Sequence, residues 1–475
     1  MTDSLHLPHD RAAIPLAPSL DQALVDAHMP TRLPVVDRRV VRLCLWAIGL
    51  GLAVGGVARL LTLLIGFVTN LAFYGRLGTS FASPAGHHLG LWVVLLPSLG
   101  GIIVGIMARW GSRAIRGHGI PEAMEQVLTN ESRIPARMTW LKPLSSAIAI
   151  GTGGPFGAEG PIIATGGAVG SLLGQRLPVS ADERKTLLAA GAAAGMAAVF
   201  SAPVSAVLLS IELLLFERRA RSLIPVALAA AAGTGMRFAL EGAGPVFPMP
   251  ELAPVAPLAL LVYALLGLAM GIAGVGVTRL TYGIEDAFEK LPIHWMWWPA
   301  LGGLVVGAVG YVAPKTLGVG YDNITEVISG QLGLAAMAWL ALAKLVSWSI
   351  ALGSGTSGGT LAPLFTIGGA AGGVAGALLA HWSWLHVDPR MAALIGMAAL
   401  FAGASRALMT SAVFVFETTM QPHALLPLLA ACATAYLVSG LMMRHTIMTE
   451  KIARRGVHVP TDFVADSTGG RAPVL

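Results

Sequence analysis

Long apolar stretches separated by short polar segments run through most of the chain. They lie near residues 40–73, 90–109, 141–176, 187–216, 223–239, 255–279, 297–313, 336–352, 361–382, 391–416 and 424–443. Several exceed the ~20 residues that a helix needs to cross a bilayer, and others fall short of it. The pattern therefore predicts a multi-pass membrane protein whose longer segments are tilted and whose short or interrupted segments are surrounded by protein or water.

Composition agrees with a multi-pass membrane protein. Of the 475 residues, 55% are hydrophobic and only 12% are charged, and the mean hydropathy is +0.72. Soluble domains carry about 25% charged residues. The excess of Lys and Arg, a formal charge of +6, gathers near the ends of the apolar stretches. This distribution is typical of membrane topology rather than of nucleic-acid binding, so we expect the lipid bilayer and no nucleic acid as a partner.

The termini carry no further signal. The polar first segment lacks the early apolar core of a signal peptide. We therefore expect both termini in the cytoplasm and the protein in the inner (plasma) membrane of a bacterium. The two cysteines have no metal-ligand spacing, so we expect no metal and no cofactor.

Two near-repeats divide the chain. Residues 142–174 align without a gap with 344–376, 202 positions later, and residues 191–212 align with 396–417. Because both blocks recur in the same order, the sequence indicates a duplication, although the repeat alone does not distinguish a parallel from an inverted one. We expect an N-terminal tail (1–37), a first membrane repeat (38–240), a connecting segment (241–257), a second repeat (258–450) and a short tail without a regulatory domain (451–475).

Three breaks rich in glycine each lead through a proline into an apolar run. They are Gly117-His118-Gly119-Ile120-Pro121, Gly157-Ala158-Glu159-Gly160-Pro161 and Gly359-Thr360-Leu361-Ala362-Pro363. Proline is tolerated in the first turn of a helix, so each break predicts a helix start. A helix start offers unpaired N–H donors and a partial positive charge. One break alone would favour a packed kink. Three of them, two related by the repeat, favour a site for a dehydrated anion.

Glu159 is the one charged residue between Pro143 and Gln175, and its counterpart in the second copy is Leu361. An ionisable residue in such surroundings is a functional candidate by default. A carboxylate at a helix start can occupy an anion site itself, and protonation would release it. We therefore expect Glu159 to be both gate and proton acceptor; a simple charge partner of its own helix is the alternative.

With these motifs, the chain resembles the CLC chloride channels and chloride/proton antiporters, from about Arg38 to Arg455. GHGIPE at 117–122, GAEGP at 157–161 and GGTLAP at 358–363 are similar to the family's three anion-pathway motifs. The resemblance implies an all-α fold with two inverted halves of tilted, partly re-entrant helices, and a homodimer with one chloride pathway per subunit. It also implies that Glu159 is the external gating glutamate and that Met448 takes the position of an inner-gate tyrosine.

The departures from the family bear on ion choice and coupling. His118 replaces the central serine, Met448 the tyrosine, Ala158 a basic residue and Leu361 an aromatic one. Leu213 replaces the internal proton glutamate of the antiporters, which favours channel-like flux. Proton-coupled exchange remains the alternative, with Glu217 or His118 as a substitute proton carrier.

Other glutamates have structural explanations. Glu217 is also interpreted as an ion-pair partner of Arg218 or Arg221. Glu212 and Glu417, paired by the second repeat, are expected to cap or brace helices.

Two functions outside transport are less well supported. An intramembrane hydrolase with Ser357 as nucleophile would need a histidine base at membrane depth, and the later histidines lie near segment ends. A structural scaffold would leave Glu159 unexplained. We therefore expect no enzyme.

Overall fold

The computed structural model describes residues 36–217 and 219–460. Most of the two expected tails lies outside these ranges. Within them every named secondary-structure element is a helix, and eight helices are long and apolar enough to cross a membrane. The expectation of an all-α membrane protein is therefore confirmed.

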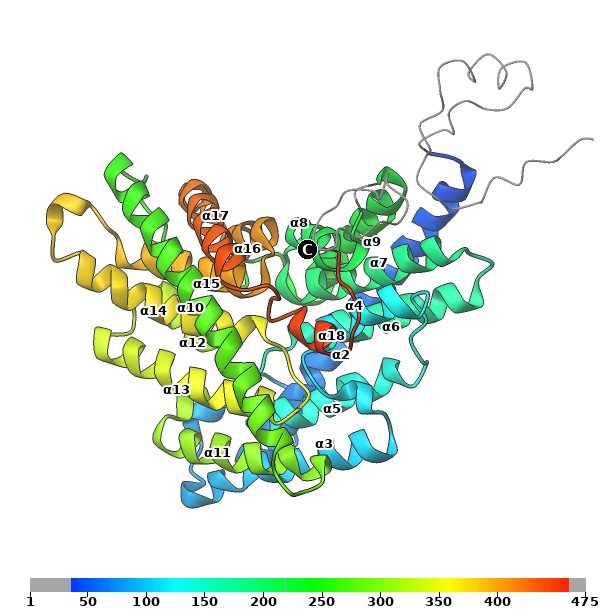
Figure 1. The fold of residues 1–475 in the computed structure, drawn as a ribbon, viewed down its shortest axis with the longest axis horizontal. Coiled ribbons are helices and arrows are strands. Elements are labelled where there is room, and N and C mark those ends of the chain that lie inside the picture. Colours follow the sequence, from blue (N-terminus) through cyan, green and yellow to red (C-terminus); the bar gives the residue numbers. More distant parts are fainter. Residues whose placement is uncertain (1–35, 218, 461–475) are drawn as a thin grey trace, which may run out of the picture.

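The first half runs from α2 to α9, and the second from α10 to α18 (Figure 1). The α-helices of the first half are α2 (Arg38–Tyr74), α3 (Leu96–Trp110), α4 (Ile120–Thr129), α5 (Met138–Gly151), α6 (Glu159–Arg176), α7 (Ala181–Phe200), α8 (Pro203–Leu209) and α9 (Ala220–Glu241). Those of the second are α10 (Pro257–Glu289), α11 (Trp298–Val312), α12 (Tyr321–Ile328), α13 (Leu334–Gly353), α14 (Leu361–Leu379), α15 (Pro389–Ser405), α16 (Leu408–Thr419), α17 (Leu425–Met442) and α18 (Glu450–Arg454).

Three apolar stretches of the sequence are each two helices rather than one. The stretch 141–176 is divided between α5 and α6, 187–216 between α7 and α8, and 391–416 between α15 and α16. In the first, a glycine-rich segment interrupts the helix, and Gly153 takes a φ of 109° that other residues rarely adopt. In the other two, Ser201 and Arg406 end a helix in the left-handed conformation. Apolar composition continues across these ends, so hydropathy alone does not reveal them.

In each half, a glycine of one helix packs against a glycine of the next helix, and the repeat relates the two contacts. A Cβ on Gly166 of α6 would lie 2.2 Å from the carbonyl oxygen of Gly191 in α7. In the second half, a Cβ on Gly368 of α14 would lie 2.4 Å from the carbonyl oxygen of Gly396 in α15. Such close backbone approach is possible only without side chains at the crossing. The two halves therefore share one packing solution at corresponding positions.

Each half caps a helix of the other. The Glu417 carboxylate of α16 accepts hydrogen bonds from the backbone N–H groups of Val204 (2.9 Å) and Ser205 (2.7 Å) at the start of α8. The Glu212 carboxylate, which follows α8, accepts from Met409 (3.0 Å) and Thr410 (3.1 Å) at the start of α16. The expectation that this pair of glutamates caps helices is confirmed.

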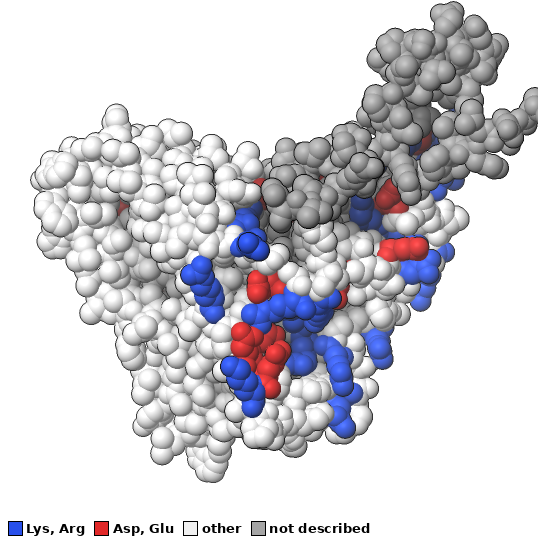
Figure 2. Space-filling model, in the orientation of Figure 1, with Lys and Arg blue, Asp and Glu red and all other residues white. Residues whose placement is uncertain are grey.

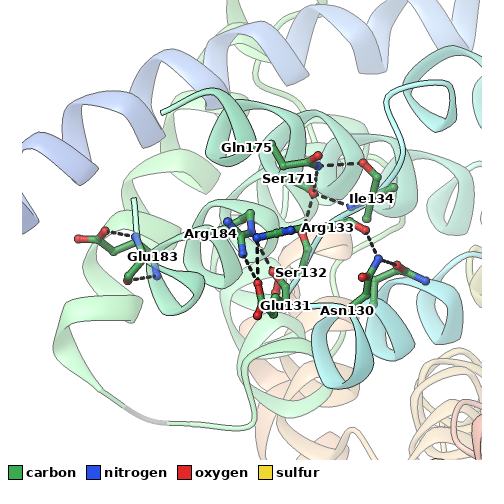
Figure 3. A network of polar contacts seen from close by, with 11 residues as sticks. Asn130, Glu131, Ser132, Arg133, Ile134, Ser171, Gln175, Glu183 and Arg184 are labelled. Atoms are coloured by element: carbon green, nitrogen blue, oxygen red, sulfur yellow. Dashed lines mark hydrogen bonds and ion pairs between the residues drawn. The ribbon is translucent and has the colours of Figure 1, made fainter. Parts of the chain in front are cut away.

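The loop between α4 and α5 is tied to the helices beside it (Figure 3). The Ser171 hydroxyl of α6 accepts from the N–H of Ile134 (2.8 Å) and donates to the carbonyl of Ser132 (2.6 Å). Arg184 of α7 donates to the Glu131 carbonyl (2.8 Å). These bonds hold α4 against α6, and both of these helices begin at the site described next.

Candidate functional site

All three glycine-rich breaks become helix starts that meet in space. The breaks lead into α4, α6 and α14, which begin at Ile120, Glu159 and Leu361. Short backbone bridges join them, Gly117 with Ser357 and Gly157 with Gly359. In the second bridge the N–H of Gly359 donates to the Gly157 carbonyl at 2.9 Å. The predicted convergence of helix starts is therefore present.

Missing side chains allow this convergence. A Cβ on Gly160 would lie 1.9 Å from the His118 carbonyl oxygen, and a Cβ on Gly119 would lie 2.5 Å from that of Gly160. No other residue fits at such distances, so the start of α4 packs backbone to backbone against the start of α6.

The Glu159 carboxylate lies against the starts of α6, α14 and α12. The residue is 1% exposed. Its Oε1 accepts a hydrogen bond from the Tyr321 hydroxyl at 3.2 Å, and its Oε2 has no hydrogen-bond partner among the described residues. A Cβ on Gly157 would lie 1.8 Å from this Oε2, and one on Gly359 would lie 2.7 Å from it. The two glycines therefore leave the space that the carboxylate fills.

A fourth glycine-rich break, absent from the sequence predictions, contributes Tyr321. Gly318 and Gly320 precede α12 with φ of 67° and 74°, just as Gly117 and Gly119 precede α4 with 97° and 93°. The signal was available, because GHGIPE at 117–122 aligns with GVGYDN at 318–323. The offset of 201 differs by one from that of the longer repeat, and no proline marks the helix start.

Two buried lysines, paired by the repeat, hold these loops in place. The Lys142 ammonium donates to the carbonyls of Ile115 (2.8 Å) and Gly117 (2.9 Å) before α4. The Lys344 ammonium donates to those of Thr316 (2.9 Å) and Gly318 (3.2 Å) before α12. Each ammonium therefore satisfies two buried carbonyls and holds the loop in front of the helix start.

Two cavities approach the helix starts. The Tyr321 cavity, about 200 Å³, is lined by Tyr321 and Ala158 together with Arg59, Arg237 and Glu241. The His118 cavity, about 680 Å³, is lined by His118 and Ile447 together with charged and tryptophan side chains. Glu159 lines neither. Figure 2 shows the charged side chains gathered in the middle of the face on which α18 lies.

The remaining predicted site residues are buried at the helix starts or next to a cavity. The His118 side chain lines its cavity, and its Nδ1 has no partner among the described residues. Met448 is buried, but the preceding Ile447, rather than Met448, lines that cavity. Ala158, Ile120, Pro121, Pro161, Thr360, Leu361, Ala362 and Pro363 are buried as well.

The candidate substitutes for the internal proton glutamate differ in position. Leu213 lies in a π-helical turn (Ser210–Leu215) that continues α8. Glu217 forms an ion pair with Lys185 at 3.1 Å and lines a separate cavity near Asp37. Its expected pairing with Arg221 is wrong, because Arg221 pairs with Asp37 instead. The other expected partner, Arg218, lies outside the described residues.

Ser357 has no histidine partner in the described chain. Its hydroxyl makes hydrogen bonds to the hydroxyls of Ser146 (2.9 Å) and Ser145 (3.3 Å). Neither group is a base strong enough to activate a serine. The hydrolase alternative therefore gains no support.

Comparison with known proteins decides the family. Residues 99–440 match the family model described as voltage gated chloride channel. The chain belongs to the CLC family. This CLC protein is 31% identical over 398 residues to the H(+)/Cl(-) exchange transporter ClcA of Vibrio vulnificus, covering 78% of this chain and 84% of that one. It is 30% identical to chloride channel protein CLC-f of Arabidopsis thaliana over 74% of this chain and 47% of that one.

Solved structures share the fold. A slow cyanobacterial Cl-/H+ antiporter superposes with a TM-score of 0.77 at 23% identity, covering 88% of this chain and 98% of that one. A CLC-type fluoride/proton antiporter gives 0.69 at 22% identity, covering 84% and 95%. The fold of two inverted halves is therefore confirmed, and the family is one of transporters and channels.

Proposed function

We propose that this CLC protein conducts chloride or a similar small monovalent anion, and that the Glu159 carboxylate is its gate. The position of that carboxylate carries the proposal. It is a buried carboxylate against the starts of α6, α14 and α12, and within the described part of the chain its Oε2 has no hydrogen-bond partner. A halide has the same charge and needs the same surroundings, so carboxylate and transported ion compete for one place.

Backbone groups provide most of the attraction in this mechanism. The starts of α4, α6 and α14 present N–H groups and the positive ends of helix dipoles, with no full positive charge bound directly to the ion. Such a site holds a dehydrated anion without trapping it. Protonation of Glu159 neutralises the side chain, which then yields its place. We therefore propose anion-binding roles for the backbone of 117–121, 157–161 and 359–362, for His118 at its cavity and for the buried Met448 beside Ile447.

Passive, channel-like flux is the form that we favour. Leu213 offers no proton site in the turn where the family's antiporters carry their internal glutamate. Glu217 is no substitute in this geometry, because it is paired with Lys185 at a different cavity.

Proton-coupled exchange is the second candidate, favoured by one observation. The imidazole of His118 lines the His118 cavity, and its Nδ1 has no partner in the described chain, so this ring could pass a proton toward Glu159. Relatives named as H(+)/Cl(-) exchange transporters also belong to this family.

Membership of the CLC family also supports a proposal for the oligomeric state and the membrane of this protein. We propose a homodimer with one pathway per subunit, in a bacterial inner membrane with both termini in the cytoplasm. The His118 cavity, surrounded by Arg113, Arg116, Lys451, Arg454 and Arg455, would then face the cytoplasm.

Flux in liposomes tests the proposal. Purified protein in proteoliposomes should release chloride down its gradient, faster at acidic pH, and Glu159→Gln should remove the pH response. Glu183→Gln, which changes a carboxylate near the surface end of α7, is the control and should retain it. A chloride gradient that drives protons uphill would replace channel-like flux with exchange. An unchanged pH response in Glu159→Gln would refute the gate assignment.

A further inference from the structure

Tyr321 is the one side chain that makes a hydrogen bond to Glu159 among the described residues. Its hydroxyl donates to Oε1 at 3.2 Å. The tyrosine starts α12, and it also lines the Tyr321 cavity, through which that side of the site is reached. It therefore stands between the cavity and the gate.

Aromatic packing fixes the tyrosine ring. The ring meets Phe200 edge-on, with centroids 5.7 Å apart and an interplanar angle of 75°, and it meets Phe247 at 5.9 Å and 68°. Phe200 in turn packs against Phe414 at 5.0 Å. These rings come from α7, α16 and the segment joining the two halves. Because the ring is clamped on several sides, its hydroxyl keeps its direction without support from Glu159.

Other charged groups near the gate are already bound elsewhere. Lys344 of α13 acts on Glu159 through its charge, but its ammonium donates to the carbonyls of Thr316 and Gly318. Arg237 of α9 lies on the Tyr321 side and pairs with Glu241 at 3.0 Å. Ala158, directly before Glu159, brings no charge at all. The closed gate therefore depends on a neutral hydroxyl for its one side-chain hydrogen bond.

We propose that Tyr321 is a positioning residue that holds the Glu159 gate closed and sets the pH at which it opens. This inference rests on the proposed function. A hydroxyl that donates to a carboxylate stabilises the ionised form, in which the carboxylate occupies the anion site. When Glu159 takes up a proton, the stabilisation by the Tyr321 hydroxyl is lost and the side chain leaves the anion site. Tyr321 thus shifts opening toward acidic pH.

Tyr321→Phe is the test, because it removes the hydroxyl and keeps the ring. A hydrogen bond to a charged group is strong enough to change the gate equilibrium about tenfold when it is removed. We expect chloride flux at neutral pH to rise several-fold, while flux at acidic pH, where the gate is already open, stays the same. The half-maximal pH should move up by about one unit.

A second tyrosine provides the matched control. Tyr263 of α10 is also buried, and its hydroxyl accepts a hydrogen bond from the Asp388 N–H at 2.9 Å, but it lines neither cavity. Tyr263→Phe should leave the pH profile unchanged. Glu159→Gln and Tyr321→Phe should not add in the double variant, because they act on one contact.

The outcomes separate the two proposals. If the wild-type protein carries no anion flux, the proposed function fails. If it carries flux that Glu159→Gln alters while Tyr321→Phe does not, the gate stands and the role of Tyr321 is overturned. An equal shift in Tyr263→Phe, or additive effects in the double variant, would also overturn it.

Discussion

A methyl group at Gly157 is expected to push the gate out of its site. The three nearest atoms to a Cβ at this position all belong to the Glu159 side chain, at 1.8, 2.4 and 2.4 Å. No positive φ constrains Gly157, so the backbone accepts alanine. The conflict in Gly157→Ala therefore falls on the flexible end of one side chain.

The displacement can be worked out from these distances. Favourable contact between heavy atoms begins near ~3.5 Å. The carboxylate must therefore move by more than about 1.5 Å, which breaks its hydrogen bond to Tyr321. A hydrogen bond to a charged group contributes about 1.5–3 kcal/mol net, before any steric overlap is counted. Loss of this hydrogen bond alone therefore lowers the closed population at least about tenfold, and the steric overlap lowers it further.

The assay is chloride release from proteoliposomes, measured with a chloride electrode from about pH 4 to about pH 8, a range that includes the ordinary pKa values of glutamate and histidine. Gly157→Ala should conduct at all pH values, like Glu159→Gln. The matched control is Gly167→Ala in α6, the helix that follows Gly157, where the nearest atom to a Cβ lies at 3.5 Å. A wild-type pH profile in Gly157→Ala would refute the placement of the carboxylate; lost flux in both glycine variants would indicate damage to α6 instead.

Three further predictions concern the Tyr321 cavity, the buried Lys344 and the helix cap formed by Glu417. At the Tyr321 cavity, Arg59 and Arg237 share the Glu241 carboxylate. Arg59→Gln should therefore slow anion flux about twofold at low ionic strength, Glu241→Gln should speed it, and high salt should abolish both effects. Equal effects of the two variants would contradict this. Lys344→Met should lower the yield of monodisperse protein on gel filtration, because two buried carbonyls each lose a donor at about 1–3 kcal/mol, whereas Lys315→Met at a half-exposed ion pair should not. Glu417→Gln should lower the thermal midpoint in detergent by a few degrees, since it weakens a helix cap worth about 0.5–2 kcal/mol, and an unchanged midpoint would argue against the cap.

The helix starts of the candidate site could be predicted from local backbone chemistry, whereas its side-chain contacts depend on the tertiary fold. The three breaks at 117–121, 157–161 and 359–363 are helix starts because glycine and proline act locally. Their convergence followed from the repeat and from the family motifs. Tyr321 was missed because its break lacks proline and because nothing local says that a tyrosine at 321 will meet a glutamate at 159.

Partners of charged side chains were equally hard to predict. Glu217 was expected to pair with Arg218 or Arg221, but among the described residues it pairs with Lys185 of α7 at 3.1 Å and with Arg219 at 3.9 Å. Lys185 is the nearer of the two cations, because helix packing brings its ammonium closer to Glu217 than the following turn brings Arg219. Glu212 and Glu417 were predicted correctly as caps, although their exchange between the halves is visible only in the fold.

The crossed caps have a consequence for biosynthesis. Val204 and the carboxylate that caps it are separated by 213 residues. At ~5–20 residues per second, the ribosome needs roughly 10–40 s to make the intervening chain. Throughout that time, the first half stands in the membrane with the start of α8 uncapped and its face toward α16 uncovered. Nascent chains arrested before Glu417 should therefore be open to insertase partners and to membrane proteases, and should become resistant only once the second half has emerged.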